Sequence, residues 1–175
     1  MRNSSEEQAM SQVCMRMPSP VGELTLVARG DKLVAILWDN DLPTRVKVGA
    51  MRDDPTHPTL VETARQLREY FAGERTVFEI ALEFHGTEFQ KRVWHALLTI
   101  PFGETRSYRD IAVQIGNHRA TRAVGAANGR NPLSIVAPCH RVIGSSGDLT
   151  GFAGGKDRKA ALLALEARSR QPALF

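Results

Sequence analysis

Two adjacent residues in the C-terminal half, Cys139 and His140, carry side chains suited to nucleophilic chemistry. They lie in "SIVAPCHRVIG", behind a proline and after an apolar run, so we expect the thiol in or beside the core. A lone buried cysteine is usually an inert small hydrophobe. Here His140 and Arg141 follow directly, and a nearby cation favours the thiolate, which is the nucleophilic form. This setting makes Cys139, rather than the one other cysteine, Cys14, the candidate nucleophile.

A histidine base needs a third group to orient it, and Glu166 is the candidate. In "KAALLALEARS", Glu166 follows Leu162 and Leu163 by four and three residues, which places it on their face of a predicted C-terminal helix. A carboxylate on an apolar face is costly unless it is paired. The pattern fits a partner for His140, and it fits a helix-edge glutamate in solvent equally well.

A glycine-rich segment, "GSSGDLTGFAGGK", joins the cysteine to that helix. It lacks the strand-loop-helix order and the terminal Lys-Ser/Thr of a nucleotide-binding P-loop, so we exclude that function. A plain connector and a loop that closes over a flat substrate both remain open.

Three predicted helices precede the cysteine. The first begins at Glu88, after the capping-box sequence "TEFQ", and runs to about Thr99. The second, in "RSYRDIAVQIG", has Ser107 as its N-cap and ends before Gly116, and the third, in "RATRAVGAANGRNP", ends at Gly129. The short turn at residues 116–119 gives the last two the form of a helix-turn-helix, which also occurs in domains that bind no nucleic acid.

The third helix is built from small residues, and Gly125 lies in its interior. An interior glycine costs about 1 kcal/mol relative to alanine, so we expect something to approach this backbone closely. A core helix would satisfy that expectation. A nucleic-acid minor groove about 6 Å wide would satisfy it too.

The N-terminal half predicts an α/β unit without evident chemistry. Strands are expected at residues 24–28 and 33–38, joined as a hairpin through "RGDK", and another in "TVFEIALEF" at residues 76–84. A helix is expected at residues 59–72, and residues 39–58 read as a loop. We therefore predict two domains, residues 1–85 and 86–175.

The charge is unevenly divided between these halves. The chain has a net charge of +4, of which residues 1–85 carry 10 basic against 13 acidic residues, a balance of −3, and residues 86–175 carry 13 against 6, a balance of +7. No acidic residue occurs from Ile111 to Gly147, where four arginines occur. This distribution fits a polyanion partner, and it also fits a solvated surface.

Other features predict a soluble intracellular protein with reduced thiols. The N-terminus has no secretory signal pattern, and no apolar run is long enough to cross a bilayer. Two cysteines cannot form a disulfide framework of the secreted kind.

The segment "NPLSIVAPCHRVIG", preceded by "ATRAVGAANGRNP" and followed by "GDLTGFAGGKDRKAALLALE", resembles the O6-alkylguanine-DNA alkyltransferases, also called methylated-DNA–protein-cysteine methyltransferases. The resemblance is dense over residues 86–168 and looser in "SPVGELTLV" and "LREYFAGE". It implies an α/β (α+β) fold, with a strand-rich N-terminal domain and a mainly helical C-terminal one. It also implies a DNA-repair protein that flips O6-alkylguanine, and also O4-alkylthymine, out of duplex DNA. The alkyl group would pass irreversibly to its own cysteine, one turnover per molecule.

The resemblance also implies roles for the residues around the thiol. Cys139 would be the acceptor, His140 its base through a bridging water, and Glu166 the group that orients His140. Asn131 would tie together the turn that holds the cysteine.

Other positions would contact substrate and DNA. Tyr108 would contact the flipped base and help rotate its phosphate, and backbone groups of Cys139, Val142 and Ala153 would read the guanine edge. Phe152 replaces the family's usual tyrosine, so it can stack on guanine but offers no hydroxyl. The surface that enters the minor groove would comprise Arg122, Ala123, Ala126, Ala127 and Gly129, and Arg122 would fill the place of the flipped base.

No cofactor and no metal are expected, because the N-terminal half offers only Cys14, His57 and His85 as softer ligands. The partner would be double-stranded DNA and the protein a monomer, with cooperative binding left open. One rival is a lesion-binding relative without transfer activity, which the presence of Cys139 opposes. Another is a cysteine hydrolase, which many turnovers per molecule would reveal.

Overall fold

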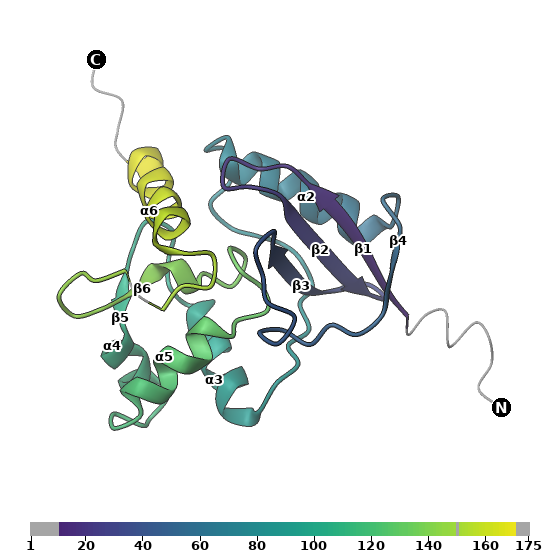
Figure 1. The fold of residues 1–175 in the computed structure, drawn as a ribbon. Coiled ribbons are helices and arrows are strands. Elements are labelled where there is room, and N and C mark those ends of the chain that lie inside the picture. Colours follow the sequence, from purple (N-terminus) through teal and green to yellow (C-terminus); the bar gives the residue numbers. More distant parts are fainter. Residues whose placement is uncertain (1–10, 150, 171–175) are drawn as a thin grey trace, which may run out of the picture. The chain divides into compact units, whose positions relative to one another are not determined.

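The structure is a computed structural model that describes residues 11–149 and 151–170, and it divides into two compact units between Phe84 and His85 (Figure 1). The first unit has a four-stranded sheet with the strand order β3-β2-β1-β4. Strands β1 and β2 and strands β2 and β3 pair antiparallel, whereas β4 is parallel to β1. The elements are β1 (Gln12–Met17), β2 (Leu24–Arg29), β3 (Lys32–Trp38), β4 (Met51–Asp53) and α2 (Pro58–Phe71).

The expected hairpin and helix of this unit are confirmed. Gly30 makes the β2–β3 turn with a φ of 58°, a left-handed conformation that favours glycine. Helix α2 packs against the sheet through an apolar stripe at helical spacing, which includes Leu60, Ala64 and Leu67. Strand β1 was not predicted, and β4 lies where a loop was expected.

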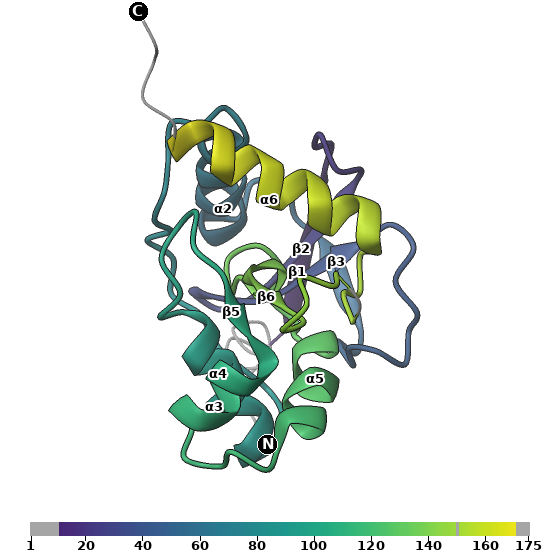
Figure 2. The same cartoon turned by 90° about the vertical axis from the view of Figure 1, so that its left-hand side faces the viewer.

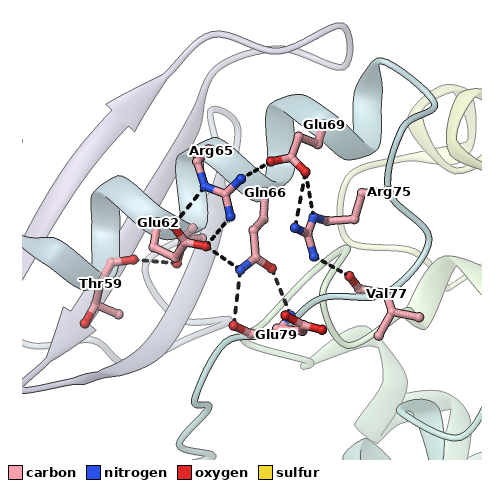
Figure 3. Close-up of polar contacts among 9 residues, drawn as sticks. Thr59, Glu62, Arg65, Gln66, Glu69, Arg75, Val77 and Glu79 are labelled. Atoms are coloured by element: carbon pink, nitrogen blue, oxygen red, sulfur yellow. Dashed lines mark hydrogen bonds and ion pairs between the residues drawn. The ribbon is translucent and has the colours of Figure 1, made fainter.

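The strand expected at residues 76–84 is wrong. Its only pairing is an isolated bridge between Leu33 and Leu82. Its backbone is held by a side chain of α2 instead: the Gln66 amide accepts from Glu79 N at 2.8 Å and donates to Glu79 O at 3.1 Å (Figure 3). Arg75 donates to Val77 O at 2.9 Å beside it. Leu33 of β3 bonds to the backbone of this segment only at the two neighbours of Leu82, donating to Ala81 O at 2.9 Å and accepting from Glu83 N at 3.0 Å. Side chains therefore satisfy the backbone groups of Glu79 and Val77.

The second unit is mainly helical and holds one short parallel strand pair, β5–β6. Its elements are α3 (Glu88–Leu97), β5 (Arg106–Ser107), α4 (Tyr108–Gln114), α5 (Thr121–Gly129), the 3-10 turn η1 (Cys139–Arg141), β6 (Val142–Ile143) and α6 (Lys156–Arg170). Helix α5 packs on α3 and α4. Figure 2 shows β5 and β6 between this group of three helices and α6.

The predicted helix starts of this unit are confirmed. Thr87 and Gln90 form the expected capping box of α3, and Ser107 caps α4 with Asp110 as its reciprocal partner. Gly116 has a φ of 79° just past α4, which turns the chain toward α5. The helix-turn-helix form is therefore present. In the part of the chain that the structure describes, no helix is both long and apolar enough to cross a membrane.

Candidate active site

Cys139 begins the 3-10 turn η1, and its side chain is 2% exposed. The turn before it is tied by Asn131, which donates from Nδ2 to Ala137 O at 2.8 Å and accepts from Leu133 N at 3.0 Å. Ile135, inside this turn, has a φ of 75° and is the only non-glycine residue among those described with a positive φ. A left-handed backbone costs an L-residue about 1–2 kcal/mol, so the two Asn131 bonds help to hold a strained loop behind the thiol.

A second asparagine, Asn128, also holds the cysteine backbone. It is buried at the end of α5 and donates from Nδ2 to Cys139 O at 3.3 Å. Helix α5 is itself fixed by Trp94, whose indole donates to Ala127 O at 2.8 Å. Sequence reasoning missed Asn128, although its place four residues after Val124 puts it on the buried face.

The His140 ring is bonded to a buried carboxylate. Its Nε2 lies 2.7 Å from Glu166 Oε1, and the two side chains are 0% and 1% exposed. This burial excludes the helix-edge glutamate in solvent. Glu166 also accepts from Gly103 N at 3.3 Å.

Arg141 shares the same carboxylate. Its Nε donates to Glu166 Oε2 at 3.0 Å, its Nη2 donates to Glu166 Oε1 at 2.9 Å, and its Nη1 donates to Ile100 O at 2.7 Å. The guanidinium also stacks 5.7 Å from the Phe102 ring centroid. The sequence suggested Arg141 as a cation that favours the thiolate, but its charge is directed to Glu166.

These contacts fix the protonation of the pair. Burial alone raises the pKa of Glu166, but the hydrogen bonds from His140 and Arg141 outweigh it and lower that pKa to about 2. Burial lowers the pKa of His140, and the bond to Glu166 only partly opposes this. At neutral pH we therefore assign a carboxylate beside a neutral imidazole that donates from Nε2. His140 Nδ1 is then an acceptor, buried and without a hydrogen-bond partner among the described residues.

Lys159 is a further group at this site, and sequence reasoning missed it. The side chain comes from α6 and is 0% exposed, and its Nζ donates to Val142 O at 2.5 Å. The spacing in the sequence indicates its burial, because Lys159 precedes Leu162 and Glu166 by three and seven residues and so shares their buried face of the helix.

The predicted substrate-contact residues gather around this lysine. The Tyr108 and Phe152 ring centroids lie 5.8 and 6.0 Å from Lys159 Nζ. Tyr108 is half-buried at the start of α4, and its position follows from the β5–β6 pairing of Ser107 with Ile143. Burial and the nearby Cys139 charge raise the Tyr108 pKa, so the phenol is neutral and able to donate.

Phe152 is buried and Ala153 partly buried within the glycine-rich segment, and Val142 lies just before that segment, in β6. That segment comes close to Tyr108, because a Cβ on Gly151 would stand 3.0 Å from the Tyr108 hydroxyl oxygen. Gly151 also has a φ of 79°. A glycine is thus required here on two counts, and the segment lies against the site instead of serving only as a connector.

Helix α5 exposes part of the predicted DNA surface. Arg122, Ala123 and Ala126 are exposed, and Gly129 is partly buried beside Gly151 O. Ala127 is 3% exposed and faces the core, so its side chain does not belong to this surface.

Gly125 bears on one of the two explanations of the small helix. A Cβ there would meet only the Tyr108 ring, at 3.8 Å, which is an ordinary contact. Packing within the unit therefore does not require this glycine, and the approach of an external partner stays a prediction.

No group of three or more His, Cys, Asp or Glu residues in residues 11–149 and 151–170 is arranged to hold a metal ion. Cys14 instead donates to Asp53 Oδ1 at 3.3 Å.

Both units match described protein families. Residues 88–168 match "6-O-methylguanine DNA methyltransferase, DNA binding domain", and residues 13–84 match "6-O-methylguanine DNA methyltransferase, ribonuclease-like domain".

Individual relatives are similar over most of the chain. A methylated-DNA–protein-cysteine methyltransferase of Mycobacterium leprae is 51% identical over 153 residues, 87% of this chain and 91% of the relative. The constitutive enzyme of that name from Bacillus subtilis is 46% identical over 85% of this chain and 91% of its own. The crystal structure of Mycobacterium tuberculosis OGT in complex with DNA is 49% identical and superposes with a TM-score of 0.82, covering 88% of this chain and 92% of that one.

Proposed function

The chain belongs to the O6-alkylguanine-DNA alkyltransferase family and repairs DNA by transferring an alkyl group to one of its own cysteines, and from this premise we propose that Cys139 is the acceptor. The observation that supports this assignment is a buried hydrogen bond between His140, which directly follows Cys139, and the carboxylate of Glu166. Cys14, the other thiol, lies in β1, where burial and its bond to Asp53 raise its pKa and disfavour a thiolate.

The proposed chemistry begins at His140 Nδ1. This atom takes the thiol proton through one water, while Glu166 stabilises the imidazolium that forms. The thiolate attacks the alkyl carbon on guanine O6, the S–C bond forms as the C–O bond breaks, and guanine leaves as the neutral base once it is protonated. The product is a stable thioether, so one molecule acts once.

The substrate pocket would lie between Tyr108 and Phe152. Tyr108 donates to the departing base, Phe152 stacks on it, and backbone groups of Cys139, Val142 and Ala153 read its edge. A flat ring with an alkylated oxygen fits this arrangement, which extends the proposal to O4-alkylthymine.

DNA would be bound through the minor groove by the exposed small face of α5. Ala123 and Ala126 are too short to keep the helix out of a narrow groove. The alkyl carbon cannot be reached inside a stacked duplex, so the base must be flipped, and Arg122 fills its place. A monomer in the cytoplasm would suffice for this activity.

Intact-mass measurement tests the proposal. After incubation with duplex DNA that contains O6-methylguanine, the protein is expected to gain one methyl group, on the peptide that holds Cys139. Cys139→Ala is expected to abolish the gain and retain DNA binding, and Cys14→Ala is the matched control that retains both. Methyl on Cys14, or continued turnover by one molecule as in a hydrolase, would refute the assignment.

A further inference from the structure

We propose that Lys159 is a positioning residue for alkyl transfer, whose buried ammonium holds Cys139 as the thiolate and fixes the Val142 carbonyl at the edge of the base pocket. This inference rests on the proposed role of Cys139 as the acceptor. It assigns a task to the one fully buried lysine among the described residues.

The contacts of Lys159 do not explain its burial. Its side chain is 0% exposed, yet its only hydrogen bond runs to a neutral acceptor, Val142 O. Within the described part of the chain, no carboxylate lies within 4.0 Å of its Nζ. A buried ammonium without an anion is expensive, and an apolar side chain of the same length would pack at lower cost. An anion that forms beside the Lys159 ammonium during the reaction would explain why this charge is buried.

Cys139 is the group that can supply that anion, because Lys159 Nζ bonds to Val142 O, and Val142 closes the cysteine turn by donating from its backbone N–H to Cys139 O. Burial lowers the Lys159 pKa, whereas a negative Cys139, and to a smaller degree Asp148, raise it. The attraction is reciprocal, so a charged Lys159 favours a charged Cys139 by the same amount. Asp148 is exposed on the loop after β6, where water screens its charge.

The other ionisable groups around the site do not supply a standing positive charge for the Cys139 thiolate. Tyr108 remains a neutral phenol. His140 is neutral until it accepts the thiol proton, because burial, and to a smaller degree Lys159, disfavours its imidazolium. The charge of Arg141 is matched by Glu166 through three hydrogen bonds. Lys159 is therefore the cation of this described cluster whose charge remains for the thiolate.

Two aromatic rings also lie near the ammonium of Lys159. The ammonium lies 5.8 Å from the Tyr108 centroid and 6.0 Å from that of Phe152, within the range in which a ring face attracts a cation. The same rings line the proposed base pocket. Lys159 thus links the thiol, the rings and the Val142 carbonyl in one arrangement, and it acts on the reaction through Cys139 without bonding to the alkyl group.

The test measures the rate of Cys139 alkylation by free O6-benzylguanine from pH 5 to 10, in the full chain. This substrate needs no base flipping, so DNA binding does not enter the rate. The variants are Lys159→Met, Lys159→Gln and Lys159→Arg. Lys156→Met is the matched control, because Lys156 is exposed on the same helix one turn earlier. Thermal unfolding establishes which variants fold.

Loss of the positive charge is expected to move the alkaline rise of the rate to higher pH in Lys159→Met and Lys159→Gln. A shift of one pH unit slows the reaction about tenfold at pH values well below the midpoint of the original chain, and the rates converge above the shifted midpoint. Lys159→Arg is expected to retain the original midpoint, and so is Lys156→Met.

A uniform loss at every pH with an unchanged midpoint would overturn the proposal and leave Lys159 a structural role. So would a Lys159→Arg profile that matches Lys159→Met. If the original chain gains no alkyl group on Cys139, the proposed acceptor has failed instead, and the two failures are distinguished by that single mass measurement.

Discussion

At the scale of single residues, Glu166 is the shared hydrogen-bond acceptor of the candidate active site. One carboxylate binds both His140 and Arg141, and it also accepts from the Gly103 amide. Replacing it leaves a guanidinium buried without a negative partner, which is costlier than losing a surface ion pair. Its charge therefore contributes to folding and to catalysis together.

Glu166→Gln is expected to lower the free energy of unfolding at pH 7 by about 3 kcal/mol and to slow transfer. The folded pKa of Glu166 is about 2, against an ordinary value of 4.5. Its stabilisation is present above pH 4.5 and is lost as the pH falls toward 2. Urea unfolding at pH 7 and pH 3 measures this.

The difference between Glu166→Gln and the original chain is expected to shrink at pH 3. Glu88→Gln, at a glutamate whose side chain is 91% exposed, is the control and is expected to change stability little. A difference that is as large at pH 3 as at pH 7 would show that shape, and not charge, makes Glu166 necessary.

At the scale of elements, α5 holds the cysteine turn with its inner face and presents its outer face to solvent, where we propose that DNA binds. Its inner face carries Val124, Ala127 and Asn128, and the last of these bonds to Cys139 O. Its outer face carries Arg122 and small residues. DNA bound to the outer face would therefore lie against the same helix that holds the cysteine turn.

Arg122→Ala is expected to slow repair of duplex DNA at least tenfold while leaving transfer from free O6-benzylguanine almost unchanged. The arginine is exposed and would act only by filling the gap that a flipped base leaves. Single-turnover rates on both substrates measure this, with Arg168→Ala on α6 as the exposed control. Equal losses on both substrates would assign Arg122 to the fold or the pocket, and the flipping role would be abandoned.

At the scale of the whole molecule, transfer changes the charge and volume of a buried site. In the proposed reaction the Cys139 thiolate becomes a neutral thioether, so the anion proposed beside Lys159 disappears. The added alkyl group also enters a site where Cys139 is 2% exposed, and overpacking a filled core costs about 1–3 kcal/mol. Both effects destabilise the spent protein.

Methylation of Cys139 is accordingly expected to lower Tm by about 5 °C, since 1 kcal/mol corresponds to about 2–4 °C in a protein of this size. In Lys159→Met the decrease is expected to be smaller, because only the steric cost remains. Differential scanning calorimetry before and after reaction measures both, with Lys156→Met as the control. Equal decreases in all three proteins would assign the whole effect to packing.

Local sequence determined two helix starts and singled out Cys139 as the candidate nucleophile. The capping residues Thr87 and Ser107 fixed these starts, because capping depends on neighbours within one turn. The spacing of Glu166 from its leucines, in contrast, fitted a buried partner of His140 and a glutamate in solvent equally well. Cys139 and His140 are consecutive in the chain, so their proximity follows from the sequence without knowledge of the fold.

Tertiary structure decided the features that depend on residues far apart in the chain. Residues 76–84 form one bridge to Leu33 and not the expected strand, and the backbone groups of Glu79 bond to the Gln66 side chain of α2. The sequence suggested that Arg141 favours the Cys139 thiolate, but its guanidinium forms an ion pair with Glu166, 25 residues later in the chain. Lys159 lies 20 positions after Cys139, and only the packing of α6 against η1 brings its ammonium to the site. Sequence patterns report which face a side chain occupies, whereas its partner is chosen by the elements that meet that face.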